Sequence, residues 1–222
     1  DKIIGFGSHI QISNSDAARS FETRPIAVTD SMIAVLTDNP EVKHVQRYST
    51  KPGMIKTADA FQGMVLKGIG PEYATSFFRR HLVEGEFPQF SDSASTNRVV
   101  ISKVIADKMK LKLGDKIDTY YIQDDVRARR LTVVGIYQTN FSEYDNLFLL
   151  TDLCMVNRLN KWQPDQVSGL ELGLYDYDKL EEATYQIADE IGQSPDLWRG
   201  LLRVECGTTQ SASLCMAQHF GC

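Results

Sequence analysis

The fold is decided by the stretch Asn97-Arg98-Val99-Val100-Ile101-Ser102 and by the nearby stretch Leu111-Lys112-Leu113-Gly114-Asp115-Lys116-Ile117. The apolar run over 98–101 predicts a short strand, and Ser102 carries the hydroxyl that caps a helix, here over 103–109. Gly114-Asp115 predicts a turn into a strand over 116–123. After a charged connection over 124–129, residues 130–138 alternate as the partner strand of a hairpin. This order predicts a compact strand–helix–hairpin unit in the middle of the chain.

The sequence on either side predicts strands separated by amphipathic helices. Before the unit, we expect a strand over 9–12, a helix from Pro25 to Leu36, strands over 42–50, 54–59 and 61–69, and a helix over 72–83. Pro52-Gly53 predicts a turn between the first two of these later strands. After the unit, we expect a strand over 147–150, a helix over 152–159 capped by Thr151, a strand over 167–175, a helix from Asp178 to Ile191, and a strand over 201–206.

The order of these elements predicts an α+β fold with two parts. Both ends of the chain give strand, helix and strand, whereas the middle is rich in strands. We therefore predict a discontinuous split β-α-β subdomain formed by residues 1–69 and 161–206, interrupted by an inserted strand-rich (small β) subdomain over 70–160. Residues 207–222 have weak periodicity and are predicted to be a tail outside this pattern.

Composition excludes several classes of protein. The chain has 222 residues and 42% hydrophobic content, which is enough for a core and argues against disorder. Its formal net charge of −5 disfavours binding to nucleic acid or to anionic lipid. No apolar run approaches the roughly 18 residues that a membrane span needs. Because the chain begins within a strand-like pattern, we expect it to be a piece of a longer protein.

No motif for catalysis, metal binding or cofactor binding is present in the sequence. The paired glycines Gly5/Gly7 and Gly68/Gly70 lack the third glycine of a phosphate-binding loop. No two histidines have the i, i+4 spacing of a metal site, and no nucleophile elbow occurs. Cys154 is predicted to be a buried thiol, while Cys206, Cys215 and Cys222 fit no metal motif and leave a disulfide open. We therefore predict no catalytic residue, no metal, no cofactor and no enzymatic activity.

Two groups of side chains are candidate partner-binding residues. In the hairpin connection, Asp124 and Asp125 precede Arg127 and Arg129, so these charges either neutralise one another or contact a partner. In the loop before the strand over 147–150, two aromatic residues either contact a partner or pack across the junction of the subdomains. The candidate set is therefore Asp124, Asp125, Arg127, Arg129, Phe141 and Tyr144.

Several motifs, taken in order, carry a resemblance to a known family. They are Gly7-Ser8-His9-Ile10-Gln11-Ile12, Val65-Leu66-Lys67-Gly68-Ile69, Val83-Glu84-Gly85-Glu86-Phe87, the two stretches quoted first, Leu131-Thr132-Val133-Val134-Gly135-Ile136-Tyr137 and Glu143-Tyr144-Asp145. Over residues 5–192 the chain resembles the extracytoplasmic domain of ABC-transporter permeases of the lipoprotein-releasing (LolC/LolE-like) and macrolide-exporter (MacB-like) superfamily, also called FtsX-like.

The resemblance implies a location, partners and a function. It implies a permease of the bacterial inner membrane with four membrane helices, of which this domain lies on the periplasmic side between the first and second. The implied partners are a cognate ATPase subunit or domain, a second permease copy in a homo- or heterodimer, and a lipoprotein or other periplasmic partner. The implied function is transport by mechanotransmission, with ATP-driven change coupled to lipoprotein release or substrate handling. The alternatives are a small secreted hydrolase with a non-standard nucleophile and a surface binding module.

Overall fold

The chain divides into two compact units, each of which is described by itself. The computed structural model describes residues 8–15, 21–57, 60–122, 126–194, 198, 202–206 and 215–216. Unit 1 comprises residues 3–47 and 165–222, and unit 2 comprises residues 48–164. The first division lies inside strand β3 (Val42–Lys56) and not after residue 69, because the second half of β3 and all of β4 (Phe61–Ile69) pair with each other in unit 2. The fold is α+β, as predicted.

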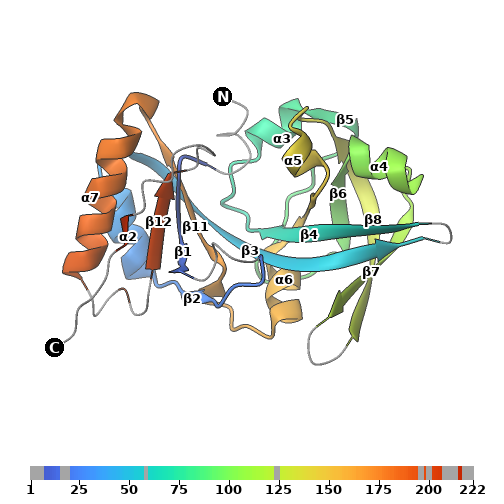
Figure 1. Ribbon diagram of the computed structural model, residues 1–222, viewed down its shortest axis with the longest axis horizontal. Helices are drawn as coiled ribbons and strands as arrows, with labels where there is room; N and C mark the ends of the chain where they lie inside the picture. Colours follow the sequence, from blue (N-terminus) through green and yellow to red (C-terminus); the bar gives the residue numbers. More distant parts are fainter. Residues whose placement is uncertain are drawn as a thin grey trace. The chain divides into compact units, whose positions relative to one another are not determined.

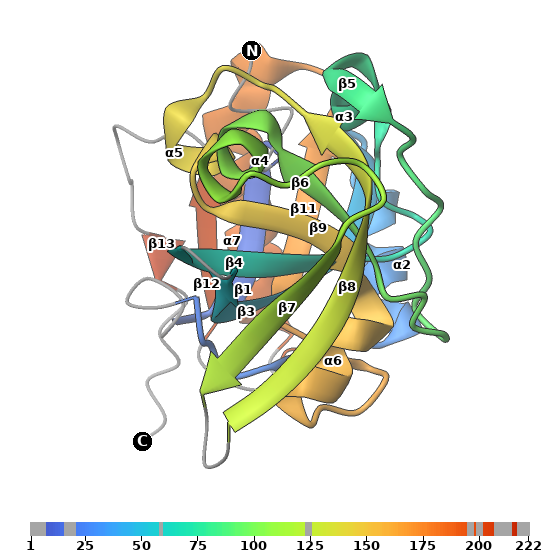
Figure 2. The same cartoon turned by 90° about the vertical axis from the view of Figure 1, so that its right-hand side faces the viewer.

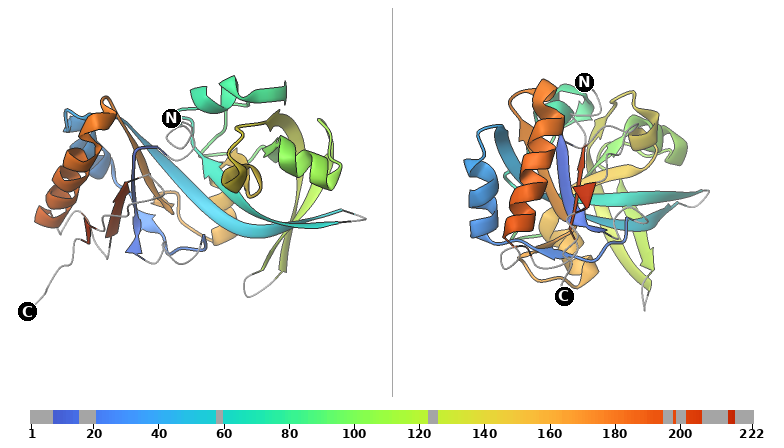
Figure 3. Two further views of the ribbon diagram at one scale, coloured as in Figure 1. Left: turned by 45° about the horizontal axis from the view of Figure 1, so that its top comes forward. Right: turned by 60° about the vertical axis from the view of Figure 1, so that its left-hand side comes forward.

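Unit 1 is an antiparallel sheet covered by two helices. The sheet order is β13 (Cys215–Met216), β12 (Leu202–Cys206), β1 (Ile10–Asn14) and β11 (Gly169–Leu174), and β11 adjoins β3. Helices α2 (Asp30–Asp38) and α7 (Leu180–Gln193) lie side by side against the sheet (Figures 1 and 3). The predicted apolar stripe of α7 is confirmed, because Leu180, Ala183, Ile187 and Ile191 are all buried. A separate two-stranded sheet pairs β2 (Ile26–Ala27) with β10 (Gln166–Val167).

Several polar side chains on the strands of unit 1 are buried and hydrogen-bonded. Glu171 is fully buried, and its carboxylate accepts hydrogen bonds from Gln46 Nε2 at 3.0 Å and from Gln11 Nε2 at 3.3 Å. These bonds offset the cost of removing a carboxylate from water. Next to it along the strand, Gly173 leaves the space that the ring of His44 fills. On the neighbouring strand, His9 Nδ1 accepts a hydrogen bond of 2.7 Å from the backbone N–H of Leu174.

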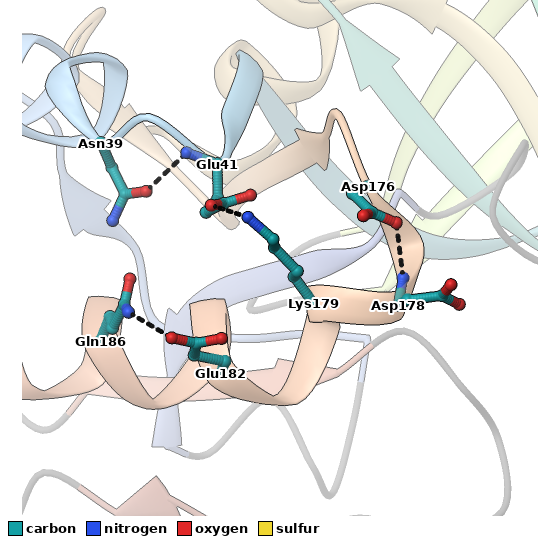
Figure 4. Close-up of polar contacts among 7 residues, drawn as sticks. All are labelled: Asn39, Glu41, Asp176, Asp178, Lys179, Glu182 and Gln186. Carbon is teal, nitrogen blue, oxygen red and sulfur yellow. Dashed lines mark hydrogen bonds and ion pairs between the residues drawn. The ribbon is translucent and has the colours of Figure 1, made fainter.

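Figure 4 shows the polar contacts where α7 begins. Lys179 Nζ contacts Glu41 Oε1 at 2.6 Å, and this hydrogen bond raises the pKa of Lys179. The Asp176 carboxylate accepts a hydrogen bond of 3.0 Å from the N–H of Asp178. The helix that the sequence predicts from Asp178 begins later in the structure. A short 3-10 turn, η2 (Tyr177–Lys179), comes first, and α7 begins at Leu180.

Unit 2 is a mixed sheet whose strands enclose the second core. Its order is β3, β4, β9 (Phe148–Asp152), β6 (Arg98–Ser102), β8 (Val126–Tyr137) and β5 (Leu82–Gly85), and β7 (Lys116–Ile122) pairs with both β3 and β8. The pairs β4–β9 and β6–β8 are parallel. Its helices, in the part of the unit that the structure describes, are α3 (Ser76–Arg80), α4 (Lys103–Met109), α5 (Ser142–Asp145) and α6 (Leu153–Asn160). The buried cluster includes Ile55, Leu66, Ile101, Tyr121, Leu131, Val133, Leu149 and Val156.

The middle of the chain folds as its sequence predicts. Ser102 Oγ accepts a hydrogen bond of 3.1 Å from the N–H of Ile105, so it caps α4 as expected. The predicted hairpin is formed by β7 and β8, with Ile117 paired to Leu131. Cys154 is buried in α6, also as predicted. Asp152, and not Thr151, stands at the N-cap of that helix.

Three further local predictions were wrong, because strand pairing overrides a local signal. The helix expected from Pro25 begins only at Asp30, since residues 26–27 pair with β10 as strand β2. The expected helix over 72–83 is limited to α3, since residues 82–85 pair with β8 as strand β5. The expected turn at Pro52-Gly53 is absent, and β3 runs through both residues. A Cβ on Gly53 would lie 2.7 Å from Tyr121 Cδ1 and 2.8 Å from the backbone O of Tyr120. Glycine is needed here because β7 passes close to β3, and not because the chain turns.

Gly53→Ala is therefore expected to destabilise unit 2 by about 1–3 kcal/mol, through overpacking against Tyr121. The matched control is Gly63→Ala on the paired strand β4, where an added Cβ meets nothing within 4 Å. Urea denaturation of the two variants measures the difference in unfolding free energy. Equal stability of the two variants would contradict this account of Gly53.

A second prediction concerns the pH dependence of unit 1. Burial lowers the pKa of His9 and of His44 below the ordinary value of 6.5, and nearby Lys43 acts in the same direction on both. Above pH 6.5 both imidazoles are neutral in the folded and in the unfolded state, so they do not make the free energy of unfolding depend on pH. As the pH falls through 6.5, the unfolded chain binds protons that the folded chain does not, and stability decreases. NMR titration of the two imidazoles should give midpoints below 6.5.

His9→Asn is the matched variant, because an amide oxygen can keep the bond from Leu174 without titrating. It should flatten the loss of stability between pH 7 and 5, measured by thermal unfolding. An unchanged pH profile would assign the effect to other groups.

Candidate functional site

The candidate site is built on the β7–β8 hairpin of unit 2. Figure 2 shows the two strands side by side, nearest the viewer. The two strands pair from Lys116 and Thr132 to Ile122 and Val126. Side chains along a strand alternate between faces. Val126, Ala128 and Arg130 are exposed on the outer face, whereas Arg127 and Arg129 are half-buried on the inner face that continues into the buried Leu131. Of the predicted site residues, Asp124 and Asp125 lie outside the described residues.

On the outer face, Arg130 forms a two-pronged ion pair within the hairpin. Its Nε and Nη2 donate to the two carboxylate oxygens of Asp118 at 2.7 and 3.0 Å. This hydrogen bonding lowers the pKa of Asp118 and raises that of Arg130. Arg130 is therefore neutralised by a residue of the partner strand.

On the inner face, Arg127 and Arg129 bond only to backbone oxygens among the described residues. Arg127 Nη1 donates to the carbonyl oxygen of Arg158 in α6 at 3.4 Å, and Arg129 Nη1 donates to that of Ala128 at 2.8 Å. Neither guanidinium reaches a carboxylate in the part of the chain that the structure describes. We call Arg127 and Arg129 the arginine face. Each retains donors that can bind a carboxylate from outside the hairpin.

The end of the hairpin also carries an apolar pair that sequence analysis missed. Ile122 and Val126 face each other across the strands and are 63% and 69% exposed. The adjacent β3–β4 hairpin ends similarly, with Phe61 69% exposed and Lys56 Nζ 5.6 Å from the centre of its ring. Ile122 and Val126 are adjacent exposed apolar side chains, which can mark a contact surface. The only sequence signal was that branched apolar residues bracket the charged connection.

The predicted aromatic residues form a stack within unit 2. The rings of Phe141 and Tyr144 are stacked with centroids 5.0 Å apart, and Tyr144 stacks at 5.6 Å on Phe148. Phe148 is buried, whereas Phe141 and Tyr144 are half-buried. The two aromatic residues therefore belong to a structural cluster that still leaves part of each ring accessible. They come from α5 and the residue before it, and the arginine face comes from β8.

A buried carboxylate holds the loop that carries this stack. Asp145 is 1% exposed and accepts hydrogen bonds from Thr139 Oγ1 at 2.6 Å, from Thr139 N at 3.2 Å and from Asn140 N at 3.0 Å. Asn140 has a φ of +59°, a left-handed conformation that asparagine tolerates better than most residues. These bonds fix the backbone immediately before Phe141.

Several groups of the kinds that bind metals or act in catalysis have structural contacts in the described part of the chain. The described residues contain no group of three or more His, Cys, Asp or Glu side chains that could hold a metal ion. Cys154 is buried, and the buried carboxylates Asp145 and Glu171 accept hydrogen bonds from hydroxyl, amide or backbone N–H donors. Within the same ranges, no helix is both long and apolar enough to cross a membrane.

The two ends of the chain form an α+β unit, and the middle of the chain forms a strand-rich unit that contains the β7–β8 hairpin. The chain belongs to the family of the MacB-like periplasmic core domain, which matches residues 3–190. The family implies a membrane-associated protein that assembles with an ABC ATPase and dimerises. The predicted resemblance to MacB-like permeases is confirmed.

Two solved structures share the fold. The periplasmic region of MacB from Actinobacillus actinomycetemcomitans has a TM-score of 0.60 and 14% identity, covering 93% of this chain and 94% of that chain. The extracellular domain of the noncanonic ABC-type transporter YknZ from Gram-positive bacteria has a TM-score of 0.57 and 16% identity, covering 88% and 98%. No curated protein sequence is similar enough to count as a match.

Asp145→Ala should destabilise unit 2 by about 2–3 kcal/mol, because three donors lose a charged acceptor in a buried place. The matched control is Glu143→Ala, which removes an exposed carboxylate from the same short helix. Chemical denaturation gives the free energies, and near-UV circular dichroism reports the order of the Phe141–Tyr144 stack. A loss in Asp145→Ala no larger than in Glu143→Ala would contradict the role given to Asp145.

Proposed function

We propose that this chain is a non-catalytic domain that couples ATP-driven conformational change of a permease to the handling of a protein partner in the periplasm. The observation that carries the proposal is the β7–β8 hairpin. It presents the arginine face on one side and the exposed Ile122–Val126 pair on the other. Membership of the family implies an associated ABC ATPase, and ATP hydrolysis by that ATPase would drive the change to which such a contact is coupled.

The chemistry of the hairpin end defines the partner. Burying Ile122 and Val126 against an apolar surface stabilises a complex by about 25 cal/mol per Å² removed from water. The arginine face favours a partner whose apolar patch is bordered by carboxylates, because each guanidinium can bind a carboxylate through two parallel bonds. Since the two features lie on opposite faces of the hairpin, the partner must enclose the hairpin end. A protein with a groove fits this requirement.

The partner class proposed is a lipoprotein or another periplasmic protein. The proposal extends to a place in the bacterial inner membrane with this domain on the periplasmic side, and to a complex of two permease copies, identical or different, with their ATPase. Lipoprotein release and transfer of another substrate are the two forms that such coupling can take. Both are served by a hairpin that binds in one nucleotide state and releases in another.

The test is site-specific photo-crosslinking from position 126 in the full-length permease. An adduct with an extracytoplasmic protein is expected, and Arg127→Gln with Arg129→Gln should reduce it about tenfold, equivalent to about 1.4 kcal/mol. The matched control is Lys112→Gln with Lys116→Gln, which removes the same charge at the far end of the hairpin. Equal adduct yields from the two double variants would rule out the arginine face as a binding element.

A further inference from the structure

A small cavity of about 150 Å³ lies in unit 2, away from the hairpin ends. It opens between the connection that follows β4 and the connection between β5 and β6. Neither connection contributed to the proposed function. The lining residues that matter here are Gly70, Pro71, Thr75, Arg79, Gln89 and Phe90.

Aromatic packing fixes the walls of this cavity. Phe78 is fully buried, stacks on Phe87 with centroids 5.7 Å apart, and meets Tyr137 of β8 edge-on at 5.6 Å. Phe87 in turn meets Phe90 edge-on at 5.6 Å. Both the helix that carries Arg79 and the connection that carries Gln89 are thereby joined to the sheet. Such preorganisation lowers the entropy cost of binding a ligand.

A buried carboxylate holds the same connection from its other end. Asp152 is fully buried, and its oxygens accept hydrogen bonds from Ser91 N at 2.9 Å, Thr96 N at 2.8 Å and Thr96 Oγ1 at 2.6 Å. Ser91 directly follows Phe90. The wall of the cavity is therefore tied to the N-terminus of α6 by three charge-assisted bonds.

Arg79 is the positive group of the cavity. Its Nε donates to Thr75 Oγ1 at 3.0 Å, and its guanidinium carbon lies 5.7 Å from the centre of the Phe87 ring. These contacts orient the planar group and use one of its five N–H donors. Among the described residues no carboxylate pairs with Arg79. Its two terminal nitrogens present the fork that binds a carboxylate through two parallel bonds.

A carboxylate lies beside the cavity. A carboxylate oxygen of Glu72 occupies the space that a Cβ on Gly70 would take, beside the cavity. A doubly charged anion such as phosphate would be repelled more strongly than a singly charged one. The cavity is open to solvent, and its volume of about 150 Å³ is enough for a ligand of a few heavy atoms.

We propose that this cavity is a binding site for a single carboxylate, presented by a small organic acid or by the free C-terminus of a peptide. Arg79 binds the carboxylate, and the Pro71 and Phe90 side chains enclose the few carbon atoms attached to it. The cavity contains no residue of the β7–β8 hairpin, so a negative result at one site does not contradict the proposal for the other.

The test is NMR titration of the 222-residue chain with sodium propionate, followed through the backbone amide resonances of Gln89 and Phe90, which line the cavity and are present in every variant. A saturable shift is expected, with a dissociation constant no tighter than the micromolar range, because about five heavy atoms at a ceiling of roughly 1.5 kcal/mol each supply at most about 7.5 kcal/mol. Arg79→Gln should weaken binding at least about tenfold, a change of about 1.4 kcal/mol. Arg80→Gln is the matched control, since Arg80 is the next residue of α3, is exposed like Arg79, and is not among the residues that line the cavity.

Three further ligands identify the source of the carboxylate. An acetylated tetra-alanine peptide with a free C-terminus that binds about tenfold tighter than propionate assigns the site to peptide ends, and equal affinity assigns it to small acids. The same peptide with an amidated C-terminus should not bind. The proposal is overturned if the amidated peptide binds equally well, if inorganic phosphate binds as tightly as propionate, or if propionate shows no saturable binding. Equal affinities of Arg79→Gln and Arg80→Gln would also overturn it.

Discussion

The close passage of β7 over β3 at Gly53 is the constraint on which unit 2 depends. β7 pairs with β8 along its length and with β3 at residues 54–56, so one strand links two hairpins. The ring of Tyr121 packs against Gly53 at this crossing, in the space that the Cβ of a larger residue at position 53 would take. Tyr121 is buried and donates to Thr119 Oγ1 at 2.9 Å, and burial raises its pKa to about 12. Thr119 Oγ1 donates in turn to the carbonyl oxygen of Arg129.

That chain of contacts gives the arginine face its rigidity. Arg129 is half-buried directly beyond the Tyr121–Thr119 bond, and Arg127 is joined to α6 through the carbonyl of Arg158. Under the proposed function, a partner bound to these side chains would pull on a hairpin that is hydrogen-bonded to the sheet and not on a free loop. Binding energy at the hairpin end can therefore be transmitted into the strands of unit 2. This is the property that a coupling domain needs, and it requires no group that breaks a bond.

The sequence predicted the fold where local chemistry and tertiary packing agree. Ser102 caps α4, and the alternating residues around Leu131 lie in β8. Both signals could be found because capping and alternation are patterns of residues close together in the sequence. Pro52-Gly53 misled because glycine also occurs in strands where another strand comes close, which no local pattern reveals. The helix expected over 72–83 stops at Arg80 because residues 82–85 gain pairing with β8, more than 50 residues later. The arginine face could be found from local charge, whereas the exposure of Ile122 and the cavity beside Arg79 depend on contacts between distant segments.

The central claim is that the β7–β8 hairpin moves with the nucleotide cycle of an ATP-driven permease. Its most direct test is the distance between spin labels attached at position 126 of two copies in the full-length permease with its ATPase, measured by pulsed electron resonance. The account predicts different distance distributions in the nucleotide-free state and in the ATP-bound state before hydrolysis. Identical distributions in the two states, with ATP turnover confirmed in the same sample, would contradict it.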